Sequence, residues 1–440
     1  MSHSDDIRPF SDDEVQPVIE RLIRQPEFQD LIGRFRAEWL HRFMPGVVRF
    51  WVRWQLQRLL GSIDSVDELQ HRVAPLIERG LRNTTDAISW SGLDNLRSDQ
   101  PCLFLSSHRD IVLDPALVNF VLYKSGHATT RIAIGDNLVD DPMVADMMRL
   151  NKSFIVRRNL SNPREMRNAF LTLSGYIRES LGDGHSVWMA QREGRAKDSI
   201  DVTDPAIIKM LHMSHKRDGV SLSEAVRDLN IVPVAISYEF DPCDGDKARE
   251  LESHYRSGSY SKRPGEDMES IVRGITGHKG RVHVAFGSPL GEGLESAQKV
   301  AAAVDDQILG LSRFFPVNYA AAEKLATRNQ VSALPDSVEM PAQSPVQPFM
   351  GLAKGDCAAC RRNSTPGFSG STPMRFSGHP AWTSASSRIH LQRRHRHDIC
   401  GTHYRSQFRA RRRHGPRVCR PWLQSRPLCS PDGPSGAAPG

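Results

Sequence analysis

The stretch that decides the fold is "CLFLSSHRDIVLDPAL", which runs from Cys102 to Leu117. Its first six residues form a short apolar run of the kind that becomes a buried strand, and Pro115 suits the first turn of a helix. His108 then lies just past the carboxyl end of the strand, and Asp114 lies at the start of the helix. Ligands of open parallel sheets bind at that edge, so the stretch predicts a binding site beside the strand.

The same alternation continues toward the C-terminus. Helical segments such as 163–181 and 203–217 separate further apolar runs, and a last helix ends near Phe315. Strand–helix alternation predicts an α/β fold with a largely parallel sheet flanked by helices, over residues 95–318. Residues 1–94 are predicted to form a helical region, with Ser65 and Glu68 as a capping box. The further strand candidates are "RIAIG", "SFIVRR", "SVWMAQ", "IVPVAISY" and "RVHVAFG".

Charge is distributed unevenly along the chain. The 440 residues carry a formal net charge of +7, but residues 341–440 hold 15 Arg, one Lys and three Asp, so residues 1–340 are net −6. We therefore expect no nucleic-acid partner for the body. Residues 319–440 are interpreted as a linker and a low-complexity Arg/Ser/Pro/Gly-rich tail, disordered or read from a shifted frame. A zinc site beginning at Cys357 and Cys360, or an RNA-binding tail, are the alternatives.

The segment 40–60, "LHRFMPGVVRFWVRWQLQRLL", is the candidate for membrane contact. It carries four arginines among phenylalanine and tryptophan, and it contains no acidic residue. A basic helix with an aromatic and aliphatic remainder is typical of a helix that lies in the bilayer interface. A buried helix whose arginines reach solvent is the alternative. No run of 18 apolar residues occurs and Cys102 and Cys243 are isolated, so we expect peripheral attachment on the cytoplasmic side of the cell membrane.

The triplet "HRD" at His108 also begins the catalytic loop of protein kinases. That loop needs an asparagine five residues after its aspartate, where this chain has Pro115 after Asp110. The other kinase motifs, D-F-G, A-P-E and V-A-I-K, are also absent from the sequence. We therefore reject a kinase and consider His108 as a base whose second ring nitrogen is oriented by a carboxylate.

Charged residues follow two later strand candidates. Arg157 and Arg158 end "SFIVRR", and paired arginines can bind a phosphate through bidentate hydrogen bonds. Glu193, Gly194 and Arg195 follow "SVWMAQ". Glycine there lets the backbone approach a ligand, and Glu193 can order the arginines or bind a substrate hydroxyl. The apolar strand around Pro233 then suits the lining of an acyl slot. Each cluster by itself is also compatible with a charged surface loop.

These four stretches, in this order, resemble the glycerophospholipid acyltransferases, which include glycerol-3-phosphate and 1-acylglycerol-3-phosphate acyltransferases. The resemblance covers residues 95 to 290. In that family four residues separate the histidine from the aspartate, whereas five separate His108 from Asp114 here. Asp114 is the favoured acid and Asp110 the alternative. The other family blocks match the double arginine, the Glu193–Gly194 pair with its following arginine, and the proline-containing strand.

The resemblance implies direct transfer of a fatty acyl group from acyl-CoA or acyl carrier protein to a hydroxyl of glycerol-3-phosphate or 1-acylglycerol-3-phosphate. His108 would be the general base and Asp114 would orient it, while backbone N–H groups near the helix start would stabilise the oxyanion. Arg157, Arg158 and Arg195 would hold the acceptor phosphate. No metal or cofactor is implied besides the acyl thioester, and the membrane surface is an expected partner. The alternatives are a thioester hydrolase and a non-catalytic, membrane-bound lipid-binding scaffold.

Overall fold

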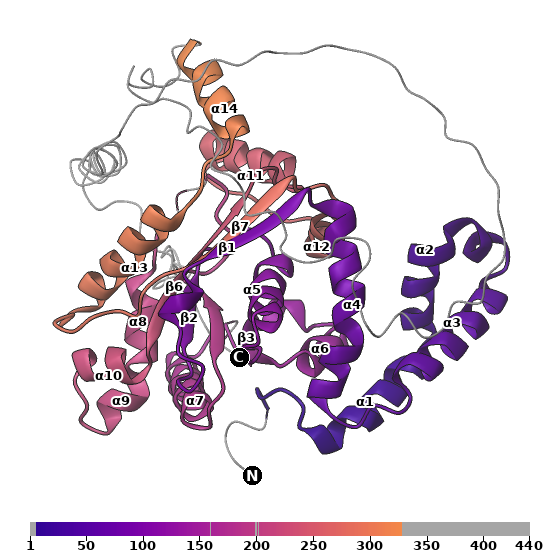
Figure 1. Cartoon of the computed structure of the whole chain (residues 1–440), viewed down its shortest axis with the longest axis horizontal. Helices are drawn as coiled ribbons and strands as arrows, with labels where there is room; N and C mark the ends of the chain where they lie inside the picture. The colour runs from indigo at the N-terminus through magenta and orange to yellow at the C-terminus, as the bar shows by residue number, and fades with distance from the viewer. Residues whose placement is uncertain (1–5, 159, 199, 201, 328–440) are drawn as a thin grey trace, which may run out of the picture. The chain divides into compact units, whose positions relative to one another are not determined.

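The computed structural model describes residues 6–327 except 159, 199 and 201. Its centre is a seven-stranded sheet with the strand order β1-β7-β6-β2-β5-β3-β4 (Figure 1). Of residues 319–440, which were interpreted as a linker and tail, 319–327 form a helix, the end of α14 (Pro316–Thr327), and the rest of that range, residues 328–440, lies outside the described residues. The strands are β1 (Ala87–Ser91), β2 (Leu103–Ser106), β3 (Arg131–Gly135), β4 (Ser153–Val156), β5 (Val187–Ala190), β6 (Ile231–Tyr238) and β7 (Arg281–Phe286).

The sheet is mostly parallel, as the strand–helix alternation predicts. The strands β6, β2, β5, β3 and β4 run in one direction, whereas β7 pairs antiparallel to β6 and β1 pairs parallel to β7. The sequence pattern misses β1, because only one of its five residues is buried and an apolar run is therefore lacking. The sheet thus begins at Ala87, before the predicted domain boundary at residue 95, and the helical region ends at Thr84.

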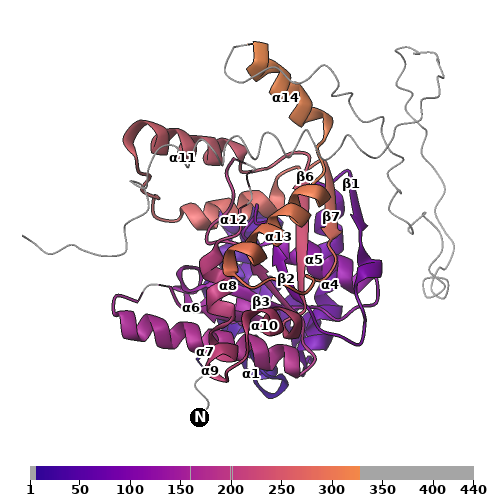
Figure 2. The same ribbon diagram turned by 90° about the vertical axis from the view of Figure 1, so that its left-hand side faces the viewer.

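Helices cover both faces of the sheet. The face that contains Leu103 and Leu105 packs against α7, α8, α10 and α13, and the face that contains Phe104 packs against α4 and α5. Figure 2 shows α8, α10 and α13 in front of the sheet. These helices and the remaining ones of this region are α4 (Val66–Thr84), α5 (Leu113–Lys124), α6 (Pro142–Leu150), α7 (Pro163–Gly182), α8 (Pro205–Leu211), α9 (Met213–Arg217), α10 (Leu222–Asp228), α11 (Asp244–Ser257), α12 (Glu266–Thr276), α13 (Ala297–Leu311) and α14 (Pro316–Thr327).

Three helices precede α4, namely α1 (Asp12–Arg24), α2 (Pro26–Phe43) and α3 (Pro45–Leu60). They share a small core with the start of α4 and with α6, and Arg21 pairs with Asp146 at 2.8 Å. The segment 40–60, predicted as one helix, is divided at Met44, where φ is −138° and ψ is 61°. Pro45 starts α3 because proline lacks the N–H that a continuing helix would need. Within the described range, no helix is both long and apolar enough to span a bilayer.

Candidate active site

The loop after β2 brings His108 to the carboxyl edge of the parallel strands. Ser107 fastens the loop to β6, because its N–H donates to the Val234 carbonyl at 2.9 Å and its Oγ accepts from the Ile236 N–H at 3.0 Å. The next residue, His108, packs edge-on against the ring of the buried Trp188, with ring centroids 5.9 Å apart. The imidazole is therefore held between two neighbouring strands, β6 and β5, that flank β2.

Asp114 forms a dyad with this histidine. Asp114 Oδ2 lies 3.0 Å from His108 Nδ1, and the Asp114 side chain is completely buried. The His108 side chain keeps 15% of its surface exposed, and its Nε2 forms no hydrogen bond with the residues that the structure describes. Because a carboxylate can only accept, Nδ1 carries the proton and Nε2 presents a lone pair. The arrangement can therefore take a proton from a bound hydroxyl.

The carboxylate of Asp114 is kept ionised by its hydrogen bonds. Oδ2 also accepts from the backbone N–H groups of Arg109 at 2.5 Å and Asp110 at 2.9 Å, while Oδ1 accepts from the Tyr238 hydroxyl at 2.8 Å. Burial by itself would raise the pKa of Asp114, but the contact with His108 and the backbone donors outweigh it, so that the pKa lies below its ordinary value. Asp114 therefore serves as a fixed negative charge behind the imidazole.

Asp110, the alternative acid, has a different function. Its Oδ1 accepts from the backbone N–H groups of Val112 at 3.0 Å and Leu113 at 2.9 Å, so it caps the start of α5. Burial and the neighbouring charge of Asp114 raise the pKa of Asp110. A side chain at Gly274 of α12 would collide with its carboxylate, so α12 closes over it. Geometry thus selects Asp114 as the partner of His108, and the loop accommodates five intervening residues by making Asp110 a cap.

The loop after β5 lies against the dyad. The N–H of Ala196 donates to the His108 carbonyl at 2.8 Å, and the other end of the loop is fixed where Thr203 donates to Asp305 at 2.7 Å. Gly194 has a φ of +76°, a left-handed conformation that favours glycine, and the space beside it is open. The turn therefore favours glycine at this position, and the predicted approach of a ligand to its backbone stays a prediction. The charge of Arg195 lowers the pKa of Asp110, which indicates that this arginine lies near the loop of His108.

The two arginines after β4 do not form a single pair. Consecutive residues of an extended chain point to opposite sides, and Arg157 accordingly contacts Asp6 at 3.2 Å whereas Arg158 reaches Glu193 at 3.6 Å. The Arg158 guanidinium also lies over Gly135, where a Cβ would approach it to 3.1 Å. Three strand spacings separate β4 from β2, about 14 Å, and only Arg158 reaches back toward the loop after β5. The structure thus places Arg158, and not Arg157, beside the loop after β5, while phosphate binding by the two arginines stays a prediction.

Two interactions of this site come from residues that the sequence interpretation did not include. Tyr238 ends β6 and contacts Asp114, as described above. Lys247 of α11 is 5% exposed, and its ammonium donates to the Arg109 carbonyl at 2.7 Å and pairs with Asp241. The signal for Tyr238 was present, since β6 has eight residues and extends past the four-residue β2 beside it. No local sequence pattern indicates the contact of Lys247 with the Arg109 carbonyl, because that contact depends on how α11 packs.

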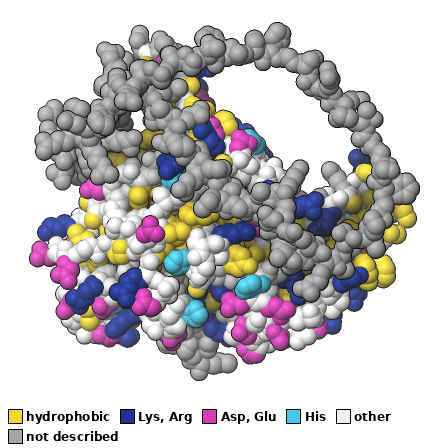
Figure 3. Space-filling model, in the orientation of Figure 1, with side chains coloured by type: hydrophobic (Ala, Val, Ile, Leu, Met, Phe, Trp, Pro, Cys, Tyr) yellow, Lys and Arg dark blue, Asp and Glu magenta, His cyan; other side chains and the backbone are white. Residues whose placement is uncertain are grey.

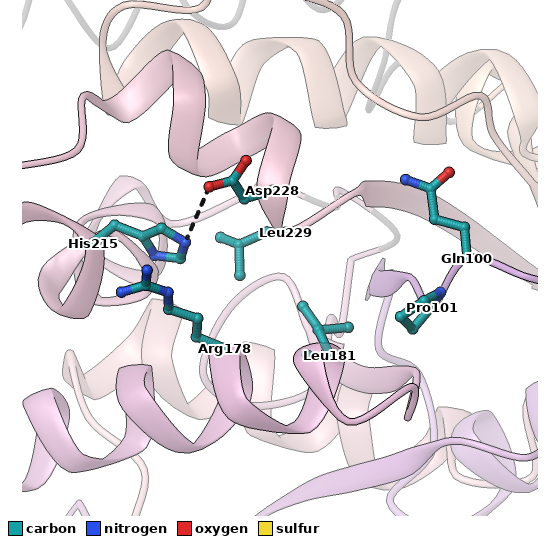
Figure 4. A pocket seen from close by; sticks show the side chains of 8 residues that line it. Gln100, Pro101, Arg178, Leu181, His215, Asp228 and Leu229 are labelled. Atoms are coloured by element: carbon teal, nitrogen blue, oxygen red, sulfur yellow. Dashed lines mark ion pairs between the residues drawn. The ribbon is translucent and has the colours of Figure 1, made fainter. Parts of the chain in front are cut away.

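A second histidine–aspartate pair lies at the opposite, amino edge of the parallel strands. It lines a cavity of about 300 Å³ between the segments that lead into β2, β5 and β6 (Figure 4). Here His215 Nε2 is 3.9 Å from Asp228 Oδ2, and the imidazole is 99% buried. None of the candidate residues from the sequence lies in this cavity, which also contains Arg178 and Leu181.

A buried carboxylate behind a histidine, at the carboxyl edge of a mostly parallel sheet, defines an α/β protein with a histidine–aspartate pair positioned where such folds bind ligands. Comparison with known proteins narrows this class. The family model described as Acyltransferase matches residues 87–237. The dihydroxyacetone phosphate acyltransferase of Bos taurus is 23% identical over 290 residues, and the human one is 22% identical over 292. Each alignment covers 64% of this chain, but only 36% and 38% of the relatives, so the chain spans little more than a third of their length.

One solved structure was also aligned with the chain. The 1-acyl-sn-glycerophosphate acyltransferase PlsC of Thermotoga maritima aligns with 65% of this chain and 96% of its own, at 15% identity and a TM-score of 0.35. The matched family segment contains β1 to β5 and all of β6 except Tyr238, and thus both residues of the dyad. Residues 87–237 therefore resemble an acyltransferase domain, and these findings support a glycerophospholipid acyltransferase family for this part of the chain.

Proposed function

We propose that the chain transfers a fatty acyl group from an acyl thioester to a hydroxyl of a glycerol-phosphate acceptor, with His108 as the general base. The observation that carries this proposal is the 3.0 Å contact between His108 Nδ1 and the buried Asp114, which leaves Nε2 open at the carboxyl edge. Glycerol-3-phosphate and 1-acylglycerol-3-phosphate are the expected acceptors. The names of the curated relatives add dihydroxyacetone phosphate as a third acceptor of the same chemical class.

The proposed reaction is a direct displacement at the thioester carbonyl. His108 Nε2 removes the proton of the acceptor hydroxyl, and the oxygen attacks the carbonyl carbon to form a tetrahedral intermediate. When the intermediate collapses, the new C–O bond stays and the C–S bond breaks. The thiolate of coenzyme A or acyl carrier protein then takes the proton back from Nε2. Asp114 stabilises the imidazolium that exists between the two proton transfers.

Four backbone N–H groups near the start of α5 are already occupied. The N–H groups of Arg109 and Asp110 donate to Asp114, and those of Val112 and Leu113 donate to Asp110. In this arrangement they orient the dyad and hold the loop that leads into α5. We therefore do not assign these four groups to the oxyanion, since an oxyanion hole needs donors aimed at the intermediate.

Arg158 and Arg195 are the proposed phosphate ligands. Arg158 is one-third exposed and bound to Glu193 at 3.6 Å, a contact loose enough for a phosphate to replace. Arg195 is partly buried beside the loop of His108. The acceptor phosphate would therefore lie between the loops after β4 and β5, with its hydroxyl toward β2. Guanidinium groups suit this purpose because they bind phosphate bidentately.

The test is an acceptor panel with the full chain and a radiolabelled acyl thioester, presented once on coenzyme A and once on acyl carrier protein. We expect label in an acylated product with at least one of glycerol-3-phosphate, dihydroxyacetone phosphate and 1-acylglycerol-3-phosphate. Arg158→Ala should raise the KM for that acceptor by about tenfold or more, whereas Arg157→Ala should change it less than threefold. Release of free fatty acid alone would favour the hydrolase, and no turnover of any thioester would favour the scaffold.

The membrane contact is proposed for an exposed aromatic surface on α2 and α3. Figure 3 shows hydrophobic side chains gathered on the right, where Figure 1 places these helices. Phe43 and Phe50 are 73% and 74% exposed, and Trp54 is half exposed with Arg58 over its ring. Arg49 does not contribute as expected, because it pairs with Asp30 at 2.6 Å. The remaining members of this surface are Trp39, Met44, Val47 and Trp51.

Exposed aromatic rings beside cationic side chains suit a bilayer interface, and we propose peripheral binding at the cytoplasmic side of the cell membrane. Flotation with liposomes that contain anionic lipid tests this. Phe50→Glu/Trp54→Glu should lose binding, while the matched control Leu251→Glu/Tyr255→Glu changes exposed residues of α11 and should keep it. Equal flotation of the two variants would reject α2 and α3 as the contact.

A further inference from the structure

Tyr238 differs from the other hydrogen-bond donors to Asp114 in the element from which it comes. Asp114 Oδ2 receives three donors, all from residues 108–110 of its own loop, whereas Oδ1 receives only the Tyr238 hydroxyl at 2.8 Å. Tyr238 is therefore the one described donor to Asp114 that belongs to another element, β6. It is also the residue that connects the carboxylate to the rigid centre of the sheet.

We propose that Tyr238 is a positioning residue of the dyad, whose hydroxyl fixes the rotation of the Asp114 carboxylate and tempers the negative charge that faces His108. This inference rests on the proposed function, in which His108 is the base. A carboxylate turns easily about its Cβ–Cγ bond, and the donors on Oδ2 share one oxygen. A donor on Oδ1 from a neighbouring strand prevents that turn, and the backbone of β6 sets its position.

The hydroxyl can serve only as a donor here. Burial, together with the charges of Asp114 and Asp110, raises the pKa of Tyr238 well above its ordinary value, so the phenol stays protonated. By donating to Oδ1 it withdraws charge from the carboxylate and makes the imidazolium less favourable. Without the Tyr238 hydroxyl, Asp114 would attract the proton of His108 more strongly. The unprotonated imidazole that accepts the hydroxyl proton would then appear only at higher pH.

The other titratable groups near Asp114 do not replace this donor. Asp110 is a like charge that raises the pKa of the phenol, and Asp241, which does the same, is bound to Lys247. Three further charged or titratable groups interact with Asp110; they are Arg195 on the loop after β5, Cys243 before α11 and Lys279 before β7. Lys279 donates to the carbonyls of Ile275 and Gly277.

Tyr238→Phe tests the proposal because it removes the hydroxyl and keeps the ring. Tyr260→Phe is the matched control, since the Tyr260 hydroxyl also donates to a carboxylate, that of Glu266 at 2.8 Å. The first measurement is an NMR titration of ¹³C-histidine-labelled full chain, in which His108→Ala assigns the His108 signal. We expect the midpoint of that titration to move upward by about half a pH unit or more in Tyr238→Phe, the size of one lost hydrogen bond. It should not move in Tyr260→Phe.

The second measurement is the pH dependence of acyl transfer. In Tyr238→Phe, kcat should fall about tenfold with KM unchanged, and the acidic limb of kcat/KM should move to higher pH. An unchanged His108 titration, or a loss of activity with an unchanged pH profile, overturns the positioning role. If the titration shifts but the parent transfers no acyl group to any acceptor, the positioning role stands and the proposed function fails. Thermal unfolding of each variant identifies a loss that comes from misfolding.

Discussion

Two histidine–aspartate pairs occupy opposite edges of one sheet, and they differ in which partner is buried. At the carboxyl edge the aspartate is fully buried and the histidine reaches solvent, with a 3.0 Å contact between them. At the amino edge His215 is 1% exposed and Asp228 is 49% exposed, and the contact is 3.9 Å. Asp114 has four hydrogen bonds, whereas neither ring nitrogen of His215 has a hydrogen-bond partner within the described chain.

The difference explains why the first pair, and not the second, is the one proposed to act as a base. A buried, ionised carboxylate stabilises an imidazolium strongly, because little water screens the interaction. An exposed carboxylate such as Asp228 is screened, and burial lowers the pKa of His215 so that it stays neutral. The first pair can take a proton and release it again, whereas the second resists taking one. The cavity of about 300 Å³ lies beside the second pair and contains no residue of the first.

The strongest test of this comparison is the same substitution in both histidines. His108→Gln should reduce acyl transfer about 100- to 10,000-fold, because the general base is lost while the size of the side chain is kept. His215→Gln should leave the rate within threefold. Initial rates with the best acceptor and saturating acyl thioester measure both variants. Comparable losses in the two would mean that the edges are not functionally distinct.

The aspartates provide the next largest effect. Asp114→Asn should lower kcat about 100-fold, because an amide cannot accept from His108 and Tyr238 at once without turning its NH₂ toward a donor. It should also destabilise the fold by about 1–3 kcal/mol through unpaired buried donors. Asp228→Asn should change kcat less than twofold and stability by less than about 0.5 kcal/mol, as is usual at an exposed position. Urea unfolding measures the stability of both variants, and initial rates measure their kcat. An Asp114→Asn variant with the parent's kcat would show that the dyad has no part in the reaction.

Much of this contrast could be predicted from the sequence. Six of the seven strands appear as short apolar runs, and the position of His108 after one of them places it at the carboxyl edge. Strands leave this signal because burial on both faces requires continuous apolar residues. The strand β1 leaves none, since it is half-buried at the margin of the sheet. The pair at the amino edge was not predicted either, because its residues come from the distant helices α9 and α10.

The finer details of the site depend on loop geometry, and the number of residues between two side chains in the sequence does not determine that geometry. Asp110 and Asp114 were both acceptable partners for His108 until the turn showed that one caps α5 and the other lies behind the ring. The divergence of Arg157 and Arg158 could have been foreseen, because neighbouring residues of an extended chain point apart. The contact between Tyr238 and Asp114 spans 124 positions of sequence, and it follows only from the unequal lengths of the adjacent strands β6 and β2.

The smallest expected effect concerns acid stability at the amino edge. Burial and the charge of Arg178 hold the pKa of His215 below its ordinary value of 6.5. The unfolded chain therefore takes up this proton at a higher pH than the native one. The resulting stabilisation is complete above pH 6.5 and is lost as the pH falls through the lower native pKa. His215→Gln has no such proton, so its stability relative to the parent should improve on acidification, by on the order of 1 kcal/mol.

Urea unfolding of parent and His215→Gln at pH 7.5, 6 and 5 measures this difference. Other buried histidines, such as His283, also destabilise the parent in acid, but they are present in both proteins and cancel in the comparison. His108→Gln serves as the control from the carboxyl edge. A stability difference between parent and His215→Gln that is constant from pH 7.5 to 5 would show that His215 titrates like an exposed histidine, and the contrast between the two edges would then rest on Asp114 and not on burial of the ring.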